Sequence, residues 1–570
     1  MKKGNHNTKI SVFAIAGNHV VTLGLDATDE AMNGLLGFAI HRTSFATATE
    51  PQESYCLKGY KPFKEVTPNP IPGAFYSTLE CPVQSFTWAD FTAKPDHKYA
   101  YKIKPVYGTP KNLQYGDELV VEITTEPLKD DVHEVYFNRG VAASQAYALK
   151  YGNLPPHKQP QNKQKEIYEW LSRGLFESII GFINQATDHT FKLRVALYEL
   201  DYLPVMQELK KARSRGVDVQ IIYSDKPNET QSHDNETVLF NAGFQLNDQE
   251  TTFARVKKSG IAHNKFFILI KNQTPTQVFT GSTNISEGGI FGHSNLGHCI
   301  KDEAIADKYL TYWEDLKTNP QGELNAKVEL IQSNISADDI PMGTSVIFSP
   351  RKDATMLDAF VEMFGNAKEI ANLTLPFNLD SRFLNELENP SDAVRYITLN
   401  KDKEADTKKK GTEIILKKGM DYVQHFRANG SVLIAPGGKI ESGWGQWLKE
   451  ILTGFNGSSV QYIHTKFMLI DPVSDTPIVI TGSANFSKPS VDLNDENMLI
   501  IKGNTRVTDI YLGEFFRIFD HLYFRYIVTK FATDAEGGFL KPNSEDWINV
   551  FKNPQSSKFK KRKALSFGFN

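Results

Sequence analysis

Two short stretches of the chain place a histidine and a lysine two positions apart inside an apolar run. They read "IAHNKFFILI" at 261–270 and "YIHTKFMLID" at 462–471, and each is followed by a small polar turn, "GSTNIS" or "GSANFS". Residues i and i+2 of a strand lie on the same face, so each histidine and its lysine should project together. The pairs are His263 with Lys265 and His464 with Lys466.

The two stretches are related by one ungapped offset of 201 positions. The offset is kept over some forty residues, which indicates a duplicated structural unit. It pairs His263 with His464, Lys265 with Lys466, Phe266 with Phe467, Val278 with Val479, Thr280 with Thr481, Gly281 with Gly482, Ser282 with Ser483, Asn284 with Asn485, Ser286 with Ser487, Ile300 with Ile501 and Lys301 with Lys502. It also pairs Asn295 with Glu496.

These residue types suit a phosphate. If the two units face each other, one cleft collects two imidazoles, two ammonium groups and two side-chain amides, and phosphate oxygens accept from lysine and asparagine. Two histidines on opposite sides of phosphorus predict a two-step displacement, in which one attacks to form a phosphohistidine and the other protonates the leaving oxygen. Lysine and asparagine would stabilise the transition state, so the prediction needs no metal and no cofactor.

The motifs "HTKFMLID" and "GSAN" resemble the HxKxxxxD and GSxN signature of the phospholipase D superfamily, whose monomeric members build one site from two copies. The likeness covers about 166–530. It implies catalytic roles for His263, Lys265, Asn284, His464, Lys466, Asn485 and Glu496, and phosphate binding by Lys265, Ser282, Asn284, Lys466, Ser483 and Asn485. Asn295 and Asp471 are expected to support the site, and no metal ligand is predicted.

The two copies differ at two positions of the motif. The first has Ile270 where the signature has an aspartate, which the second keeps as Asp471, and the resemblance implies that this aspartate braces a loop away from the phosphate. The resemblance also suggests that Glu496 orients His464 and that Asn295 takes that place for His263. A histidine beside a carboxylate holds its proton more firmly, which predicts His464 as the general acid and His263 as the nucleophile.

The bulk composition is that of an ordinary globular protein with several domains. The chain has 570 residues, 40% hydrophobic and 23% charged, and a net charge of −3, which neither requires nor excludes a nucleic-acid partner. Three widely spaced cysteines fit neither a metal pattern nor a disulfide framework, and the first apolar run is too short for an export signal. We therefore expect a soluble cytoplasmic protein without a transmembrane segment.

The pattern of elements predicts an all-β region followed by two pseudo-symmetric α/β lobes, each a mixed sheet flanked by helices. The N-terminal strands, with "KPDHKYAYKIKPV" among them, resemble a fibronectin type III or immunoglobulin-like sandwich. A strand–helix–strand unit at 191–225 indicates a largely parallel sheet there. The predicted domains are the sandwich at 1–126, a connector at 127–165, lobe 1 at 166–335, lobe 2 at 336–530 and a basic, flexible tail at 531–570.

The substrate is the least determined part of the prediction. The residues report on the phosphodiester group and not on what is esterified to it. The resemblance implies hydrolysis of a phospholipid as the first choice, with peripheral membrane contact. Cleavage of DNA or RNA is the alternative, and a non-catalytic module that binds anions or acts as a scaffold is the second alternative. A monomer would suffice for a complete site. Trp444 and Trp447 are a minor candidate for an aromatic lid.

Overall fold

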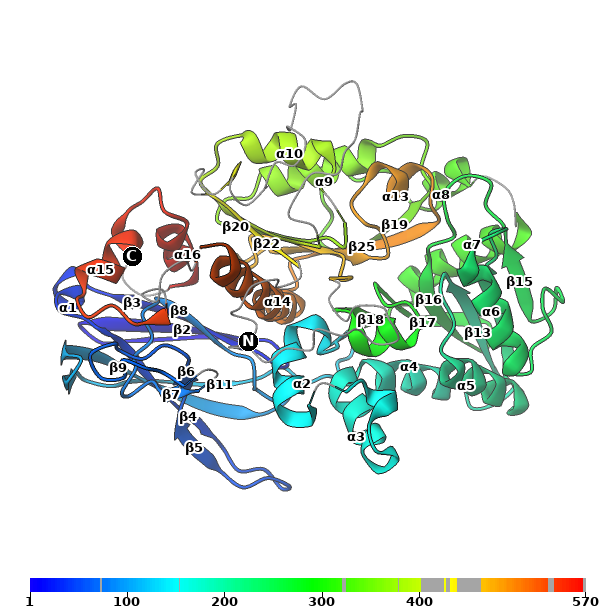
Figure 1. The fold of residues 1–570 in the computed structure, drawn as a ribbon. Coiled ribbons are helices and arrows are strands. Elements are labelled where there is room, and N and C mark those ends of the chain that lie inside the picture. Colours follow the sequence, from blue (N-terminus) through cyan, green and yellow to red (C-terminus); the bar gives the residue numbers. More distant parts are fainter. Residues whose placement is uncertain are drawn as a thin grey trace.

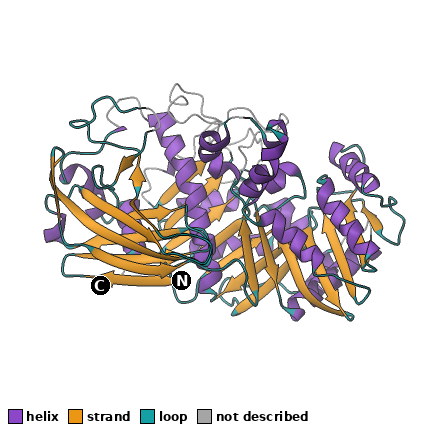
Figure 2. Ribbon diagram, turned by 90° about the horizontal axis from the view of Figure 1, so that it is seen from below, coloured by secondary structure: helices purple, strands orange, loops and turns teal. Residues whose placement is uncertain are grey.

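The structure is a computed structural model (Figure 1). It describes residues 1–71, 74–152, 154–319, 324–377, 379–400, 425–426, 431–437, 463–531 and 538–566. An N-terminal antiparallel β region is followed by two α/β units, as the sequence predicts at this coarse level. In Figure 2 strands dominate the left side, around the N-terminus, whereas strands and helices are mixed on the right.

The N-terminal region consists of two antiparallel sheets that share one hydrophobic core. The first sheet has the order β1-β2-β3-β8 and the second β10-β9-β4-β5, with β11 also paired to β9. Strands and helix are β1 (Lys2–His6), β2 (Ile10–Ala16), β3 (Val21–Ala27), α1 (Asp29–Met32), β4 (Gly37–Ser44), β5 (Glu53–Cys56), β6 (Lys58–Gly59), β7 (Tyr76–Ser77), β8 (Thr87–Asp90), β9 (Lys98–Thr109), β10 (Asn112–Tyr115) and β11 (Leu119–Thr124). The more specific fibronectin-like topology stays a prediction.

Lobe 1 contains a seven-stranded sheet in the order β12-β18-β17-β16-β13-β14-β15. Its elements are β12 (His133–Phe137), η1 (Gly140–Ala143), α2 (Ser144–Tyr151), η2 (Pro156–Lys158), α3 (Gln161–Ser172), α4 (Leu175–Asn184), β13 (Phe191–Leu197), α5 (Leu203–Ser214), β14 (Asp218–Ser224), α6 (Thr230–Asn241), β15 (Thr252–Arg255), β16 (Lys265–Lys271), β17 (Thr274–Gly281), η3 (Gly288–Gly292), β18 (Leu296–Ile300), α7 (Glu303–Thr318) and α8 (Asn325–Ile331). The predicted connector therefore contributes the edge strand β12 to this sheet.

Lobe 2 contains a second seven-stranded sheet, in the order β19-β25-β24-β23-β20-β21-β22. Within each lobe the strands lie in the same sequence: first, seventh, sixth, fifth, second, third, fourth. The elements are β19 (Gly343–Ser349), α9 (Thr355–Gly365), β20 (Ile370–Thr374), α10 (Ser381–Glu388), β21 (Val394–Leu399), β22 (Val432–Pro436), β23 (Phe467–Ile470), β24 (Ile478–Gly482), α13 (Lys488–Asp492), β25 (Glu496–Lys502) and α14 (Thr505–Phe531).

The parallel part of each sheet is smaller than the sequence led us to expect. Among the described strands, only β13, β14 and β15 run parallel in lobe 1, and β20, β21 and β22 in lobe 2, whereas the motif-bearing strands pair antiparallel with their neighbours. The reason is local, because β16 and β17 are joined by a tight turn in which Asn272 and Gln273 both have positive φ. A short turn reverses the chain, and a parallel connection would need a crossover.

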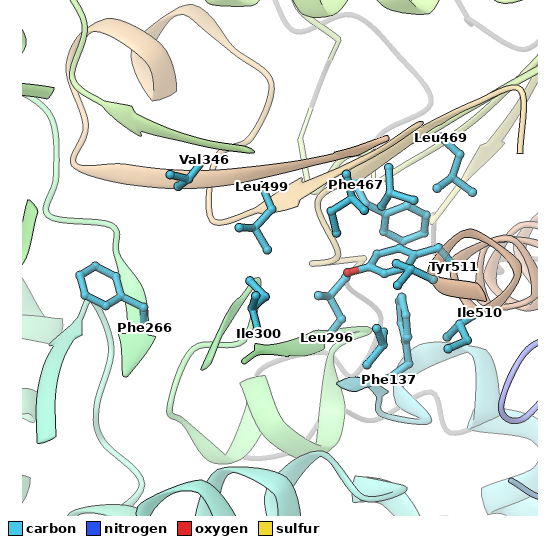
Figure 3. Close-up of a cluster of buried hydrophobic side chains, with 14 of the residues drawn as sticks. Phe137, Phe266, Leu296, Ile300, Val346, Phe467, Leu469, Leu499, Ile510 and Tyr511 are labelled. Atoms are coloured by element: carbon cyan, nitrogen blue, oxygen red, sulfur yellow. The ribbon is translucent and has the colours of Figure 1, made fainter. Parts of the chain in front are cut away.

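The two lobes share an apolar core. The buried cluster includes side chains from both motif-bearing sheets and from α14. Figure 3 shows Leu296 and Ile300 of lobe 1 facing Phe467 and Leu499 of lobe 2, with Phe137, Ile510 and Tyr511 to one side and Phe266 farther away on the other. A dry contact of this kind fixes the relative position of the lobes, which a site divided between them requires.

The C-terminal segment is not the flexible tail that its basic composition suggested. Its described residues form α15 (Glu545–Lys552) and α16 (Ser557–Leu565), which pack beside the N-terminal strands (Figure 1). The apolar face of α15 joins the core of the N-terminal region, and the indole Nε1–H of Trp547 donates to the carbonyl of Leu35 at 3.0 Å. The buried Arg562 pairs with Asp26. Apolar and paired charged side chains therefore anchor this segment.

Among the described residues, no helix combines the length and apolarity needed to cross a membrane.

Candidate active site

Each His–Lys pair lies at the start of the central antiparallel strand of its sheet. In both lobes the lysine ammonium donates to the carbonyl of the histidine two positions earlier, at 2.8 Å for Lys265 and 2.9 Å for Lys466. Both lysines are fully or almost fully buried. The duplicated sequence therefore gives a duplicated local geometry, with the ammonium held beside its histidine.

Backbone hydrogen bonds between the lobes bring the two pairs together. The amide N–H of His263 donates to the carbonyl of Asp495, and that of Asp495 donates to the carbonyl of Ile261, both at 3.0 Å. The amide of His464 donates to the carbonyl of Ser294 at 3.0 Å. Short parallel β-bridges join the two lobes, Ala262 with Asp495 and Ser294 with Ile463. They place His263 next to Glu496 and His464 next to Asn295.

The side-chain partners of the histidines are consequently crossed, and the sequence prediction for them was wrong. His263 Nδ1 contacts the Glu496 carboxylate at 2.9 Å, and His464 Nδ1 contacts Asn295 Oδ1 at 2.9 Å. We had expected Glu496 to orient the histidine of its own lobe. The lobes instead exchange partners, because the bridging segments of one lobe run alongside those of the other.

The chemistry of these partners fixes the tautomer of both rings. A carboxylate and an amide oxygen accept hydrogen bonds and do not donate them, so Nδ1 must carry the proton in His263 and in His464. The other ring nitrogen, Nε2, is then unprotonated in the neutral ring. Each ring therefore keeps a lone pair on Nε2, which is the atom that could attack phosphorus or carry a proton.

The two motif serines support this arrangement. Ser282 Oγ donates to Asn295 Oδ1 at 2.8 Å and accepts from the amide of Leu296, and Ser483 Oγ accepts from the amide of Asn497 at 3.0 Å. Both side chains are fully buried. We therefore revise their expected role from phosphate ligand to a brace for the strand that carries Asn295 or Glu496.

The motif asparagines have different surroundings in the two lobes. Asn284 Nδ2 donates to the Glu199 carboxylate at 2.6 Å, and Ser286 Oγ contacts the same oxygen at 3.3 Å. Asn485 is half-buried, and its backbone N–H donates to Ser490 Oγ. Sequence reasoning missed Glu199, although its position directly after a strand of an α/β unit is a common location for functional residues.

A third histidine lies beside the site and was also missed. The ring of His293 is centred 6.1 Å from that of His464. The repeat offset pairs His293 with Asn494 of lobe 2, whose Nδ2 donates to Glu496 Oε1 at 3.2 Å. The two lobes thus use the same position for different purposes, since one residue braces the carboxylate and the other contacts an imidazole.

Burial dominates the electrostatics of the site. It lowers the pKa of His263 to about 4, although Glu496 opposes the change, and it lowers the pKa of His464 well below its ordinary value with help from Lys466. Burial also lowers the pKa of Lys265 to about 8, and that of Lys466 falls well below its ordinary value. Because burial disfavours the charged form of both lysines in the free site, an anionic ligand bound beside them is favoured.

Glu496 stays ionised in this environment. Burial raises the pKa of its carboxyl, but the neighbouring His263 and Lys265 more than offset burial, so the net pKa lies below the ordinary value. A buried carboxylate that remains charged stabilises positive charge on the imidazole it contacts.

Asp471 lies at the far end of its strand, where it accepts hydrogen bonds from successive backbone amides. Its carboxylate contacts the N–H groups of Lys368, Glu369 and Ile370 at 2.8–3.2 Å, and so ties the end of β23 to the start of β20. Ile270 in lobe 1 is buried in the apolar core instead. The predicted bracing by aspartate is thus seen in the second copy.

Two remaining points concern metals and the aromatic lid. Within the part of the chain that the structure describes, no group of three or more His, Cys, Asp or Glu side chains is arranged to hold a metal ion. Trp444 and Trp447, the lid candidates, lie outside the described residues.

The sequence matches the profile of a known family over both lobes. The family is described as "Cardiolipin synthase, PLD-like domain", and the match covers residues 179–317 and 363–519, slightly more than half of the chain. The chain therefore belongs to this phospholipase D-like family. Membership supports a phosphoryl-transfer activity of the phosphodiesterase type.

Several solved structures are similar at low identity. Nuc, a phospholipase D family member from Salmonella typhimurium, is 22% identical over 25% of this chain and 87% of its own, with a TM-score of 0.21. Phosphatidylserine synthase from Haemophilus influenzae Rd KW20 is 12% identical over 69% and 93%, with a TM-score of 0.41. Yeast tyrosyl-DNA phosphodiesterase is 11% identical over 58% and 88%, with a TM-score of 0.31. No curated protein matches the sequence.

Proposed function

We propose that this protein is a metal-independent phosphodiesterase that hydrolyses phospholipid phosphodiester bonds through a phosphohistidine intermediate. The observation that carries the proposal is the crossed pairing of His263 with Glu496 and of His464 with Asn295. In this pairing two imidazoles from separate lobes are held by each other's lobe with Nε2 unprotonated. We further propose that the lobes are related by a pseudo-twofold axis and that one phosphorus atom binds between them.

The proposed reaction has two displacements. In the first, His263 Nε2 attacks phosphorus and forms an N–P bond, the P–O bond to the leaving group breaks, and the leaving oxygen takes the Nε2 proton of His464, which acquires this proton from solvent when the anionic substrate binds. In the second, water attacks phosphorus, its proton passes to His464 Nε2 and the N–P bond breaks. Lys265, Lys466, Asn284 and Asn485 stabilise the charge on the non-bridging oxygens in both transition states.

Because the partners are crossed, the choice of nucleophile and general acid between His263 and His464 needs a different reason. By proton affinity alone, Glu496 would now favour His263 as the acid. The nucleophile, however, carries a cationic ring for the whole life of the phosphohistidine, and a buried carboxylate stabilises that ring. His464 has a neutral amide partner and releases its proton more easily, as an acid must. We therefore keep His263 as nucleophile and His464 as general acid.

Lipid is our first choice of substrate because the matching family is described by the name of a lipid-forming enzyme. Nucleic acid is the alternative, since the groups assigned to phosphorus would suit either ester. The panel that tests this consists of a phosphatidylcholine dispersion, single-stranded DNA, duplex DNA and a chromogenic phosphodiester, each with and without EDTA. Turnover of lipid but not DNA is expected, and EDTA should leave it unchanged.

Three variants serve as controls in the same panel. His263→Ala and His464→Ala should abolish turnover, whereas His189→Ala, which removes an exposed histidine of lobe 1, should leave it unchanged. Turnover of DNA but not lipid would select the nuclease. No turnover by the wild type would support a non-catalytic anion-binding or scaffold module, and strong EDTA inhibition would contradict the mechanism. We expect the protein to act as a monomer in the cytoplasm.

A further inference from the structure

Glu199 brings a second carboxylate to the phosphate-binding groups of lobe 1. It is the second residue after β13, and its backbone carbonyl accepts a hydrogen bond of 3.0 Å from the amide of Ile285, which fixes the backbone there. Its carboxylate holds Asn284 Nδ2 at 2.6 Å and contacts Ser286 Oγ at 3.3 Å. Because Asn284 is assigned to a non-bridging oxygen, Glu199 would lie one side chain away from the bound phosphate.

The charge of Glu199 reaches across both lobes. It opposes the burial that lowers the pKa of Lys265 and of Lys466, which come from different lobes. Asp201 stands on the same side, and burial together with Glu199 raises the pKa of its carboxyl to about 7. With Glu496, two carboxylates therefore face the two lysines.

This balance suits one negative charge on the ligand better than two. A phosphodiester carries a single charge, whereas the phosphomonoester released by its cleavage has a second pKa of about 6 and is largely a dianion at neutral pH. The second charge would develop next to the Glu199 carboxylate, and like charges at such distances repel. Lobe 2 has no such carboxylate where β20 ends, since the chain continues there as Leu375, Pro376 and Phe377.

We propose that Glu199 is a specificity-determining residue that admits a phosphodiester monoanion and expels the phosphomonoester dianion formed from it. The inference rests on the proposed phosphodiesterase function. Its consequence is weak product inhibition, because the same residue that tolerates the substrate disfavours the product. Glu199 acts through its fixed charge and through Asn284, and it neither attacks phosphorus nor moves a proton.

The test compares binding of glycerol phosphate, a soluble phosphomonoester, at about pH 5 and about pH 7 in the full-length protein. Calorimetry should show that Glu199→Gln binds it about tenfold more tightly than the wild type at the higher pH, where the ligand is a dianion. At the lower pH, where it is a monoanion, the two should agree within about threefold. KM for a chromogenic diester should also change by less than about threefold.

Two further variants separate charge from structure. Glu199→Asp keeps the charge and should restore weak binding of the dianion, and Glu229→Gln removes a half-exposed carboxylate of lobe 1 that pairs with Lys226 and should change nothing. Equal tightening at both pH values, no tightening, or loss of binding by Glu199→Gln would overturn the proposal. Failure of the phosphodiesterase function would appear separately, as absence of diester turnover in the wild type while calorimetry still reports on the monoester.

Discussion

The two copies of the motif agree in the groups assigned to phosphorus and differ in the groups that support them. Each lobe has a histidine and a lysine whose ammonium donates to the histidine carbonyl. The partner of the imidazole, however, is a carboxylate for His263 and an amide for His464. Since each partner comes from the opposite lobe, a difference in the sequence of lobe 2 acts on the histidine of lobe 1. In the proposed mechanism, this asymmetry of the duplicated unit gives the two histidines of one site different roles.

Substitution of the two histidines is expected to have the largest effect on turnover. His263→Ala removes the proposed nucleophile, and we expect turnover of every diester to fall by at least about 10⁴, with no phosphohistidine formed. His464→Ala removes the acid of the first displacement and the base of the second, so turnover is lost with every diester. The first displacement alone slows by about 10²–10⁴ for a poor leaving group and much less for a p-nitrophenolate, which needs no proton. Rapid-quench trapping of the labelled protein, together with release of p-nitrophenolate, distinguishes the two.

The reverse result would exchange the roles. If His464 rather than His263 carries the trapped phosphoryl group, or if His263→Ala retains the burst of p-nitrophenolate, then Glu496 serves the acid and not the nucleophile. His293→Asn is the control, because it removes the neighbouring imidazole and introduces the residue found at that position in lobe 2.

A second prediction concerns the partners rather than the rings. Glu496→Gln keeps an oxygen that can accept from His263 Nδ1 but removes the charge, so the cationic phosphohistidine loses its stabilisation and kcat should fall by about 10². The pKa of His263 should fall further, because Glu496 opposes the lowering by burial. Single-turnover rates and a pH titration of the imidazole measure both.

The reciprocal change is Asn295→Asp, which gives His464 a charged partner. It should raise the pKa of His464 and shift the acid-dependent limb of kcat to higher pH, since the imidazolium gains a carboxylate. Asn295 also donates to the carbonyl of Gly289, so thermal denaturation should accompany the kinetics. An unchanged pH profile in both variants would mean that the crossed partners do not set the proton affinities.

The pH dependence of the lysines sharpens the comparison on a smaller scale. In the proposed site Lys265 binds phosphate as an ammonium, and its pKa in the free protein is about 8. As pH rises through that value the ammonium loses its proton, so kcat/KM should fall by about tenfold per pH unit above it. Lys265→Arg keeps the charge at all these pH values and should remove the fall. If the fall in kcat/KM persists in Lys265→Arg, then loss of the proton from Lys466 rather than from Lys265 causes it.

Much of the fold could be predicted because its signals are local. The strand–helix–strand unit at 191–225 is present as β13, α5 and β14, with β13 and β14 paired parallel and with Val205, Met206, Leu209 and Ala212 of α5 buried. The repeat offset also located the strands of both motifs, since a fixed spacing is preserved when a unit is duplicated.

The sequence predictions that were wrong or incomplete concern contacts between residues that are distant in the sequence. The crossed partners follow from bridges such as Ala262 with Asp495, which no local pattern encodes. Glu199 is separated from Asn284 by 85 positions, so only the folded chain shows that they meet. The C-terminal segment looked like a solvated basic tail because the acceptor of Arg562, Asp26, is near the other end of the sequence.

The smallest effect on activity is expected where the copies differ most in sequence, at Asp471 and Ile270. Asp471→Ala leaves several backbone amides at the start of β20 without their acceptor, which should lower the free energy of unfolding by about 1–3 kcal/mol. Asp471→Asn keeps one acceptor oxygen and should cost less. Activity per folded molecule should be unchanged in both, because Asp471 lies at the opposite end of its strand from His464.

Ile270→Asp, which copies the second motif into the first, should instead destabilise lobe 1, because Ile270 is 3% exposed within the apolar core. Denaturant unfolding with parallel activity assays measures all three, and a loss of activity in Asp471→Ala beyond its unfolded fraction would place this aspartate in the site after all.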